Sequence, residues 1–158
     1  MSRAAAWREE LPPALRGAQL VLSESELSTE VPVPMHGRGD QVYLANGWLV
    51  PVDTKRRSKA VVYFKDIIQL SAYGFILARA STRLFGQNLP VATHGFVRLV
   101  VGRQVSYVPV KLLSSTQVIS LWNRYWELKR KKARPAIPEA YKCAQCPKKT
   151  NCPVGRRR

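Results

Sequence analysis

Acidic residues are scarce in this sequence. Ten Asp and Glu stand against 26 Lys and Arg, so the 158-residue chain has a formal charge of +16. This surplus favours a polyanionic partner, because Lys and Arg that neutralise phosphates supply most of the sequence-independent affinity for nucleic acid. An anionic membrane surface or a ribosome is compatible with the same charge.

Long apolar runs and cysteines are also few. No run approaches the roughly 20 residues of a membrane span, and the N-terminus lacks the apolar core of a secretory signal. We therefore expect a cytoplasmic protein with no membrane partner. The three cysteines are odd in number and bunched near the end, which argues against a disulfide framework and for a metal or a cluster.

The hydrophobic patterns predict strands, a helix, strands and a helix, in that order. The expected elements are an edge strand at 20–27, a hairpin within 37–55, a brief strand at 61–64, a helix at 67–81 with Asp66 as its N-cap, a second hairpin at 95–101 and 104–112, and a helix at 116–133. This order predicts an α/β fold whose mixed central sheet is flanked by helices. We expect the core in residues 1–134 and a Cys-rich, basic segment in residues 135–158.

The first hairpin raises an electrostatic problem. Asn46-Gly47 is the strongest short signal for a two-residue turn, and the pairing that it dictates places Asp40 opposite Asp53. Like charges directly opposed in a sheet are destabilising. Lys55 follows two residues after Asp53, so its side chain leaves the same face.

A divalent cation would convert this repulsion into coordination. Mg²⁺ prefers one or two carboxylates together with waters and a substrate phosphate. Such an ion polarises a phosphodiester and lowers the pKa of an attacking water, while an ammonium steadies the developing charge. The alternative is that Lys55 neutralises one aspartate at a frayed, solvated strand end.

Three short motifs in this region occur in the same order as in a known enzyme superfamily. Gly37-Arg38-Gly39-Asp40, Asp53-Thr54-Lys55 and Gln69 with Tyr73 resemble the PD-(D/E)XK nuclease superfamily, specifically its RecB-like branch with the CRISPR-associated Cas-four exonucleases. The match covers roughly residues 36–77 well.

This resemblance implies a restriction-endonuclease-like core and an Mg²⁺- or Mn²⁺-dependent DNA nuclease. Asp40 and Asp53 would hold the metal, Lys55 would serve the attacking water, and Gln69 and Tyr73 would lie beside the site. In this chain 39 residues precede Asp40, so most of the helical region found there in the family is missing. Glu24, Glu26 and His36 are weaker candidates for a further ligand, and a Gln and Tyr pair on a buried helix is equally compatible with a structural role.

The spacing Cys143-x2-Cys146-x5-Cys152 is typical of soft-metal ligation. The resemblance implies a 4Fe-4S cluster, but the family's N-terminal Cys has no counterpart here. A non-Cys fourth ligand such as His94, a zinc site, or three reduced thiols remain alternatives.

Basic residues follow the predicted site directly, and we expect Arg38, Arg56, Arg57 and Lys59 to contact a DNA backbone. The leading hypothesis is a metal-dependent DNA nuclease, an exonuclease or end-processing enzyme, acting with the CRISPR adaptation machinery or another protein partner. A non-catalytic DNA-binding partner subunit with the same fold is the main alternative. A zinc-ribbon RNA or ribosome binder explains the charge and the cysteines but not the aspartates.

Overall fold

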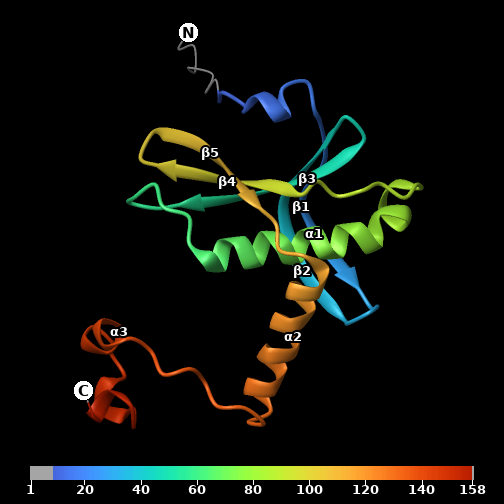
Figure 1. The fold of residues 1–158 in the computed structure, drawn as a ribbon. Helices are drawn as coiled ribbons and strands as arrows, with labels where there is room; N and C mark the ends of the chain where they lie inside the picture. Colours follow the sequence, from blue (N-terminus) through green and yellow to red (C-terminus); the bar gives the residue numbers. More distant parts are fainter. Residues whose placement is uncertain (1–8, 158) are drawn as a thin grey trace. The chain divides into compact units, whose positions relative to one another are not determined.

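The structure is a computed structural model that describes residues 9–157. A five-stranded sheet ordered β1-β2-β3-β4-β5 forms its centre (Figure 1). The strands are β1 (Gln19–Thr29), β2 (Met35–Ala45), β3 (Trp48–Arg56), β4 (His94–Val101) and β5 (Gln104–Lys111). Neighbours are antiparallel except β3 and β4, which run parallel, so the predicted mixed sheet is confirmed. A parallel pair needs a crossover connection, and the helix α1 (Phe64–Phe85) supplies it.

The first hairpin forms as the sequence predicts. Asn46 and Gly47 both have positive φ, 51° and 80°, which is the backbone of a type I′ turn. Ala45 pairs with Trp48, and the ladder continues in that register to Gln41 opposite Val52. The second hairpin, β4 and β5, turns at Gly102, where φ is 58°.

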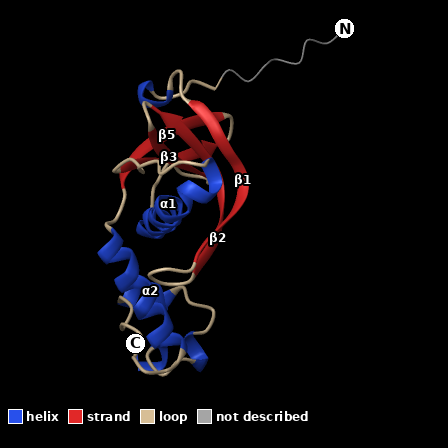
Figure 2. Cartoon of the chain, turned by 90° about the vertical axis from the view of Figure 1, so that its right-hand side faces the viewer, coloured by secondary structure: helices blue, strands red, loops and turns tan. Residues whose placement is uncertain are grey.

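Both faces of the hairpin are covered, as its two apolar faces require. On one face, Val42 and Leu49 pack in a core cluster with α1. On the other, Tyr43 and Val50 pack with Leu15 of the short helix η1 (Pro13–Leu15). The sheet curves around α1 (Figure 2).

α1 begins earlier than predicted. Tyr63 is its N-cap, and Asp66 lies at the third helical position, where its carboxylate accepts a hydrogen bond from the Tyr63 N–H at 2.8 Å. The expected strand at 61–64 is therefore wrong, because this capping box draws Phe64 into the helix. Gly86 ends α1 in the left-handed conformation, with φ 72°. No helix within residues 9–157 is both long and apolar enough to cross a membrane.

The chain divides into two compact units, the first ending at Ile119 and the second beginning at Ser120. The division falls within α2 (Ser115–Lys129), whose start is fixed by reciprocal hydrogen bonds between Ser114 and Gln117. The second unit also contains α3 (Ala140–Ala144), η2 (Lys149–Asn151) and η3 (Gly155–Arg157).

Candidate active site

Asp40 and Asp53 are the first residues beyond the paired part of the hairpin. From this point β2 pairs only with β1, and β3 only with β4. Asp40 Oδ2 accepts a hydrogen bond from the backbone N–H of Thr54 at 2.7 Å, so this carboxylate reaches across to β3. The charge of Asp40 lies near enough to Asp53 to raise the pKa of its carboxyl, but the directly opposed pair that the turn predicts is not part of the β2–β3 ladder.

Asp53 is almost completely buried, with 1% of its surface exposed. The Lys55 ammonium lies 2.9 Å from Oδ2 as an ion-pair partner, and Oδ2 makes no further hydrogen bond among the described residues. Burial raises the pKa of the Asp53 carboxyl. Lys55 acts in the opposite direction, and the nearby charges of Asp40 and Asp66 add to the rise. The interpretation of this ion pair as a solvated strand end is wrong for Asp53.

Lys55 is held by a chain of hydrogen bonds from α1. Its Nζ donates to Gln69 Oε1 at 2.8 Å, and Gln69 Nε2 donates to the Tyr73 hydroxyl at 2.7 Å. Gln69 Nε2 also lies 3.5 Å from Asp53 Oδ1. One helical turn separates Gln69 from Tyr73, so both point to the same side of α1. Four of the five predicted catalytic residues, Asp53, Lys55, Gln69 and Tyr73, are thus in direct contact, whereas Asp40 is joined to β3 through the Thr54 N–H.

Gly37, three residues before Asp40, lies against the ring of Tyr73. A Cβ built on Gly37 would lie 3.1 Å from Cε1 of Tyr73, so any side chain here would press on the tyrosine ring. The Gly37–Asp40 segment of β2 and the helix that carries Gln69 and Tyr73 are therefore adjacent in space, which the sequence match alone does not establish.

Arg57 has a role that sequence reasoning missed. Its Nη1 and Nη2 both donate to the carboxylate of Asp66 at 2.6 Å, and Nη1 also donates to the Val61 carbonyl. Asp66 is 1% exposed, and the bonds from Arg57 hold the pKa of its carboxyl below the usual value. This bidentate pair fixes the first turn of α1 and, through it, Gln69. The predicted DNA contact of Arg57 stays a prediction.

The other predicted DNA-contacting residues lie at the surface. Arg38 forms an exposed ion pair with Glu24 at 2.8 Å, and Arg56 and Lys59 are exposed. His36 is also exposed, so neither it nor the paired Glu24 is drawn into the buried cluster.

The cysteines form no metal group as they stand. Among residues 9–157 no set of three or more His, Cys, Asp and Glu side chains is arranged to hold a metal ion. Cys143 is buried, Cys146 is exposed and Cys152 is half-buried, all as free thiols. Backbone N–H groups of Gly155 and Val154 lower the pKa of the Cys152 thiol, which favours the thiolate that metals bind.

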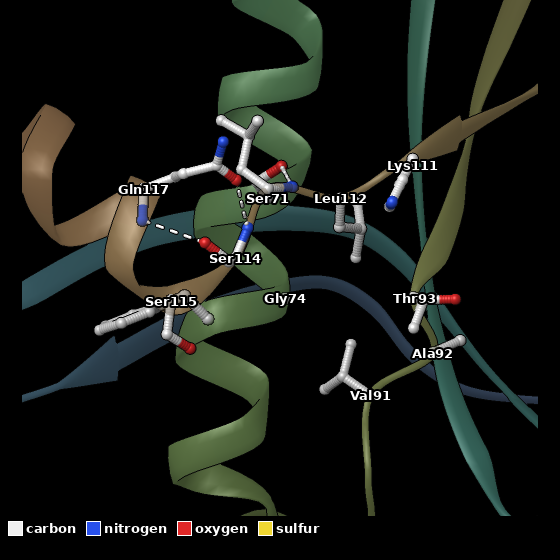
Figure 3. A pocket seen from close by; sticks show the side chains of 12 residues that line it. Ser71, Gly74, Val91, Ala92, Thr93, Lys111, Leu112, Ser114, Ser115 and Gln117 are labelled. Carbon is white, nitrogen blue, oxygen red and sulfur yellow. Dashed lines mark hydrogen bonds between the residues drawn. The ribbon is translucent and has the colours of Figure 1, made fainter.

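A cavity of about 400 Å³ lies away from these carboxylates, between α1, residues 91–93 and the start of α2 (Figure 3). Three of its polar side chains already form hydrogen bonds within the protein. Ser71 Oγ donates to the Ile67 carbonyl and accepts from the Leu113 N–H, while Ser114 and Gln117 cap α2. The carboxylate cluster is therefore the stronger candidate for chemistry.

Comparison with known proteins supports the fold alone. No protein-family model matches the chain, and no curated protein matches it. Among 21 matching chains of solved structures is the one titled "Crystal structure of SSO0001", with a TM-score of 0.51 and 16% sequence identity. The match covers 89% of this chain and 64% of that one, so this chain spans less than two thirds of its neighbour's length.

Proposed function

We propose that the chain is a divalent-metal-dependent DNA nuclease that hydrolyses phosphodiester bonds, acting as an exonuclease or end-processing enzyme. The observation that carries this proposal is the buried Asp53 carboxylate, whose Oδ2 is paired with the Lys55 ammonium at 2.9 Å and makes no further hydrogen bond among the described residues. A buried carboxylate whose pKa is raised by burial and by neighbouring acidic charges is a candidate functional group.

The donor set fits a hard divalent cation. Asp53 Oδ2 and the Asp40 carboxylate would hold Mg²⁺ or Mn²⁺, because both ions prefer oxygen ligands and keep waters in their remaining positions. When bound, the ion supplies polarisation of the scissile phosphate and a lowered pKa for an attacking water. A raised pKa for Asp53 in the metal-free chain agrees with a carboxylate placed for a cation.

Lys55 and its helix partners orient the reactants. The Lys55 ammonium, held 2.8 Å from Gln69 Oε1, can donate to the attacking water and to the negative charge that develops on the phosphate. Gln69 fixes the direction of that ammonium, and Tyr73 fixes Gln69. The exposed side chains of Arg38, Arg56 and Lys59 supply positive charge for a DNA backbone near the site.

The cysteine segment enters this proposal only as a structural site. Cys143, Cys146 and Cys152 are proposed to bind a 4Fe-4S cluster or zinc with help from a ligand outside the triplet, since both groups take four protein ligands. Visible absorbance of anaerobically purified protein distinguishes the cluster from zinc. A colourless preparation without metal contradicts both assignments.

A non-catalytic DNA-binding partner subunit is the second candidate. The observation that favours it is the lack, within residues 9–157, of a third acidic or histidine ligand beside Asp40 and Asp53. In that case the fold would deliver DNA to a protein partner, such as a component of CRISPR adaptation.

Cleavage of end-labelled single- and double-stranded DNA with Mg²⁺ or Mn²⁺ separates the two candidates. Under the nuclease proposal, Asp53→Ala abolishes metal-dependent cleavage and keeps DNA binding, whereas Glu30→Gln, which changes an exposed acid just after β1, cleaves normally. A second readout is thermal stability, because Mn²⁺ at 100 times its Kd stabilises the native state by about 2.7 kcal/mol. Salt-sensitive binding without cleavage, together with no Mn²⁺ effect on the wild type, would establish the binding subunit.

A further inference from the structure

A second polar cluster lies on the sheet face opposite Asp53. Arg98 of β4 donates through Nε to Glu9 Oε1, and the Tyr107 hydroxyl of β5 donates to the same oxygen at 2.8 Å. Arg98 and Tyr107 are direct partners in the β4–β5 ladder, so their side chains leave the same face. Glu9 comes from the segment before η1, far from both in sequence.

Two more arginines surround this cluster. A cavity of about 250 Å³ is lined by Arg56, Arg98 and Arg103 together with Glu9, and its remaining lining residues are uncharged. Arg56 and Arg103 are exposed, while the side chains of Arg98 and Glu9 retain 21% and 28% of their surface. Three arginines and one glutamate line this space, so its lining carries an excess of positive charge.

The cluster is built for an anion. Hydrogen bonds from Arg98 and Tyr107 outweigh the effect of burial and lower the pKa of Glu9, so its carboxylate is ionised at neutral pH. Burial and the bond to Glu9 raise the pKa of Tyr107 to about 12, which keeps its hydroxyl a donor. A guanidinium and a hydroxyl aimed at one carboxylate oxygen form a donor pair that a phosphate oxygen accepts equally well.

This cavity continues toward the candidate active site. An adjoining cavity of about 310 Å³ shares Glu9 and Arg98 with it and is also lined by Asp40 and Thr54. Thr54 is the residue whose N–H holds the Asp40 carboxylate. The two cavities therefore connect the arginines to the gap between β2 and β3.

We propose that Arg56, Arg98 and Arg103 form a phosphate-binding site, and that Glu9 occupies it as an internal substitute for phosphate until a ligand displaces it. The ligand class is a phosphate group, carried by a nucleic-acid strand or by a small phosphate compound. Phosphate binding here stands independently of catalysis. The further assignment, that a strand bound at these arginines passes on to Asp40, rests on the proposed nuclease function.

The test compares Glu9→Gln with Glu10→Gln in EDTA, so that neither cleavage nor a metal is required. Glu10 is the matched control because the change in charge is the same and its own partner, Arg16, lies at the surface. The experiment has two arms: calorimetry measures the affinity for pyrophosphate, and fluorescence anisotropy measures the affinity for a labelled single-stranded oligonucleotide. Glu9→Gln is expected to raise affinity about tenfold in at least one arm, since a charge-assisted competitor is removed. Glu10→Gln is expected to leave affinity within about twofold.

The pattern across the arms identifies the source of the phosphate. A gain for the oligonucleotide alone assigns a nucleic-acid strand, and a gain for pyrophosphate alone assigns a small phosphate compound. Equal, small effects of Glu9→Gln and Glu10→Gln in both arms would overturn the proposal.

Arg103→Gln provides an independent check that does not disturb the Glu9 contacts. Arg103 lies in the exposed turn between β4 and β5, so the variant is expected to fold and to bind the same ligand about fivefold more weakly. Its control is Arg83→Gln, whose arginine lies in the last turn of α1 and donates to the Ser28 carbonyl. Equal losses in the two variants mean general charge attraction only and reject the site. The two proposals fail separately. If the wild type does not cleave DNA but the binding effects of Glu9→Gln and Arg103→Gln are seen, the nuclease function fails and the phosphate site stands. If cleavage depends on Asp53 but these binding effects are absent, the phosphate site fails and the nuclease function stands.

Discussion

Asp53 carries a charge that the folded chain disfavours. Burial raises the pKa of its carboxyl above the ordinary value of 3.8, in spite of the ion pair with Lys55. A raised folded-state pKa means that ionisation of Asp53 weakens folding as the pH rises above the unfolded value, and that this cost is absent at lower pH. Functional sites commonly retain such a cost because the charge is needed for chemistry.

Asp53→Asn is therefore expected to stabilise the metal-free protein at pH 7 by about 1 kcal/mol while removing activity. Lys55 keeps its bond to Gln69 and part of its exposure to water, so it is not left without a partner. Urea denaturation with EDTA at pH 8 and at pH 4 measures the effect, which shrinks at the lower pH. A destabilised variant at pH 8 would mean that the ion pair outweighs burial.

The Arg57–Asp66 pair changes stability with pH in the opposite direction from Asp53. The bonds from Arg57 lower the pKa of the Asp66 carboxyl, so its contribution to stability is fully present above the unfolded value of 3.8 and is lost as the pH falls toward the folded value. Asp66→Asn breaks a pair whose carboxylate is 1% exposed, and we expect a cost of about 3 kcal/mol at pH 7.

Denaturation at pH 7 and below pH 4 tests this prediction, because the penalty of Asp66→Asn decreases at acid pH. Glu24→Gln is the matched control. Its ion pair with Arg38 is exposed on both sides, so its loss costs at most about 0.5 kcal/mol at pH 7. Equal costs for the two variants would show that the Arg57 pair contributes no more than a surface contact.

At the scale of elements, the β3–α1–β4 connection determines where the site forms. It places Gln69 of α1 over the end of β3, and it depends on a close approach at Gly95 of β4. A Cβ on Gly95 would lie 2.7 Å from the Pro51 carbonyl oxygen and 2.9 Å from Leu70 Cδ2. Neither neighbour moves easily, because one is backbone and the other is fully buried.

Gly95→Ala is accordingly expected to destabilise the protein by about 2 kcal/mol through overpacking. Ser106→Ala, at an exposed position of the neighbouring β5, is expected to stay within about 0.5 kcal/mol of the wild type. Urea denaturation of both variants measures the effect, read as a change in the midpoint while the dependence of the unfolding free energy on urea concentration stays the same. An unchanged midpoint for Gly95→Ala would mean that the strand shifts without cost.

Local chemistry made most elements predictable. The Asn46-Gly47 turn fixed the register of β2 and β3, and hence the neighbourhood of Asp40 and Asp53, because a two-residue turn determines every pair that follows. The start of α1 was misplaced, since the decisive contact is between Asp66 and Arg57, across a loop with no helical or strand period.

The difference between local patterns and long-range contacts also explains which residues around the site were not predicted. Asp40, Asp53 and Lys55 were singled out by the register of the hairpin, and Gln69 and Tyr73 by the resemblance to a known family. Glu9, Arg98 and Tyr107 lie in no shared motif, and 89 residues separate the first two. Only the folded sheet brings such residues together, so no local pattern predicts them.

At the scale of the whole molecule, the positive charge is unevenly divided. Ser120–Arg158 contains 12 Lys and Arg and two acidic residues, so +10 of the total charge of +16 belongs to the second unit. This unit also exposes Tyr125 and Trp126, whose rings are 5.4 Å apart. Base stacking on exposed aromatics beside cations is typical of single-strand binding. The first unit carries the candidate active site, and the second carries most of the net positive charge.

This division predicts how binding responds to salt. If the chain contacts about six phosphates of a single strand, its affinity falls by roughly two to three orders of magnitude between 50 and 200 mM salt. Neutralising two contacts with Lys131→Gln and Lys132→Gln is expected to flatten the slope of log K against log salt by about 1.4, which is about 0.7 for each phosphate. Lys65→Gln and Lys111→Gln, which remove the same charge from the first unit, serve as controls. Anisotropy titrations in EDTA give the slopes. Equal flattening by the two pairs would mean that the net charge of the chain, and not the basic second unit, governs its attraction to DNA.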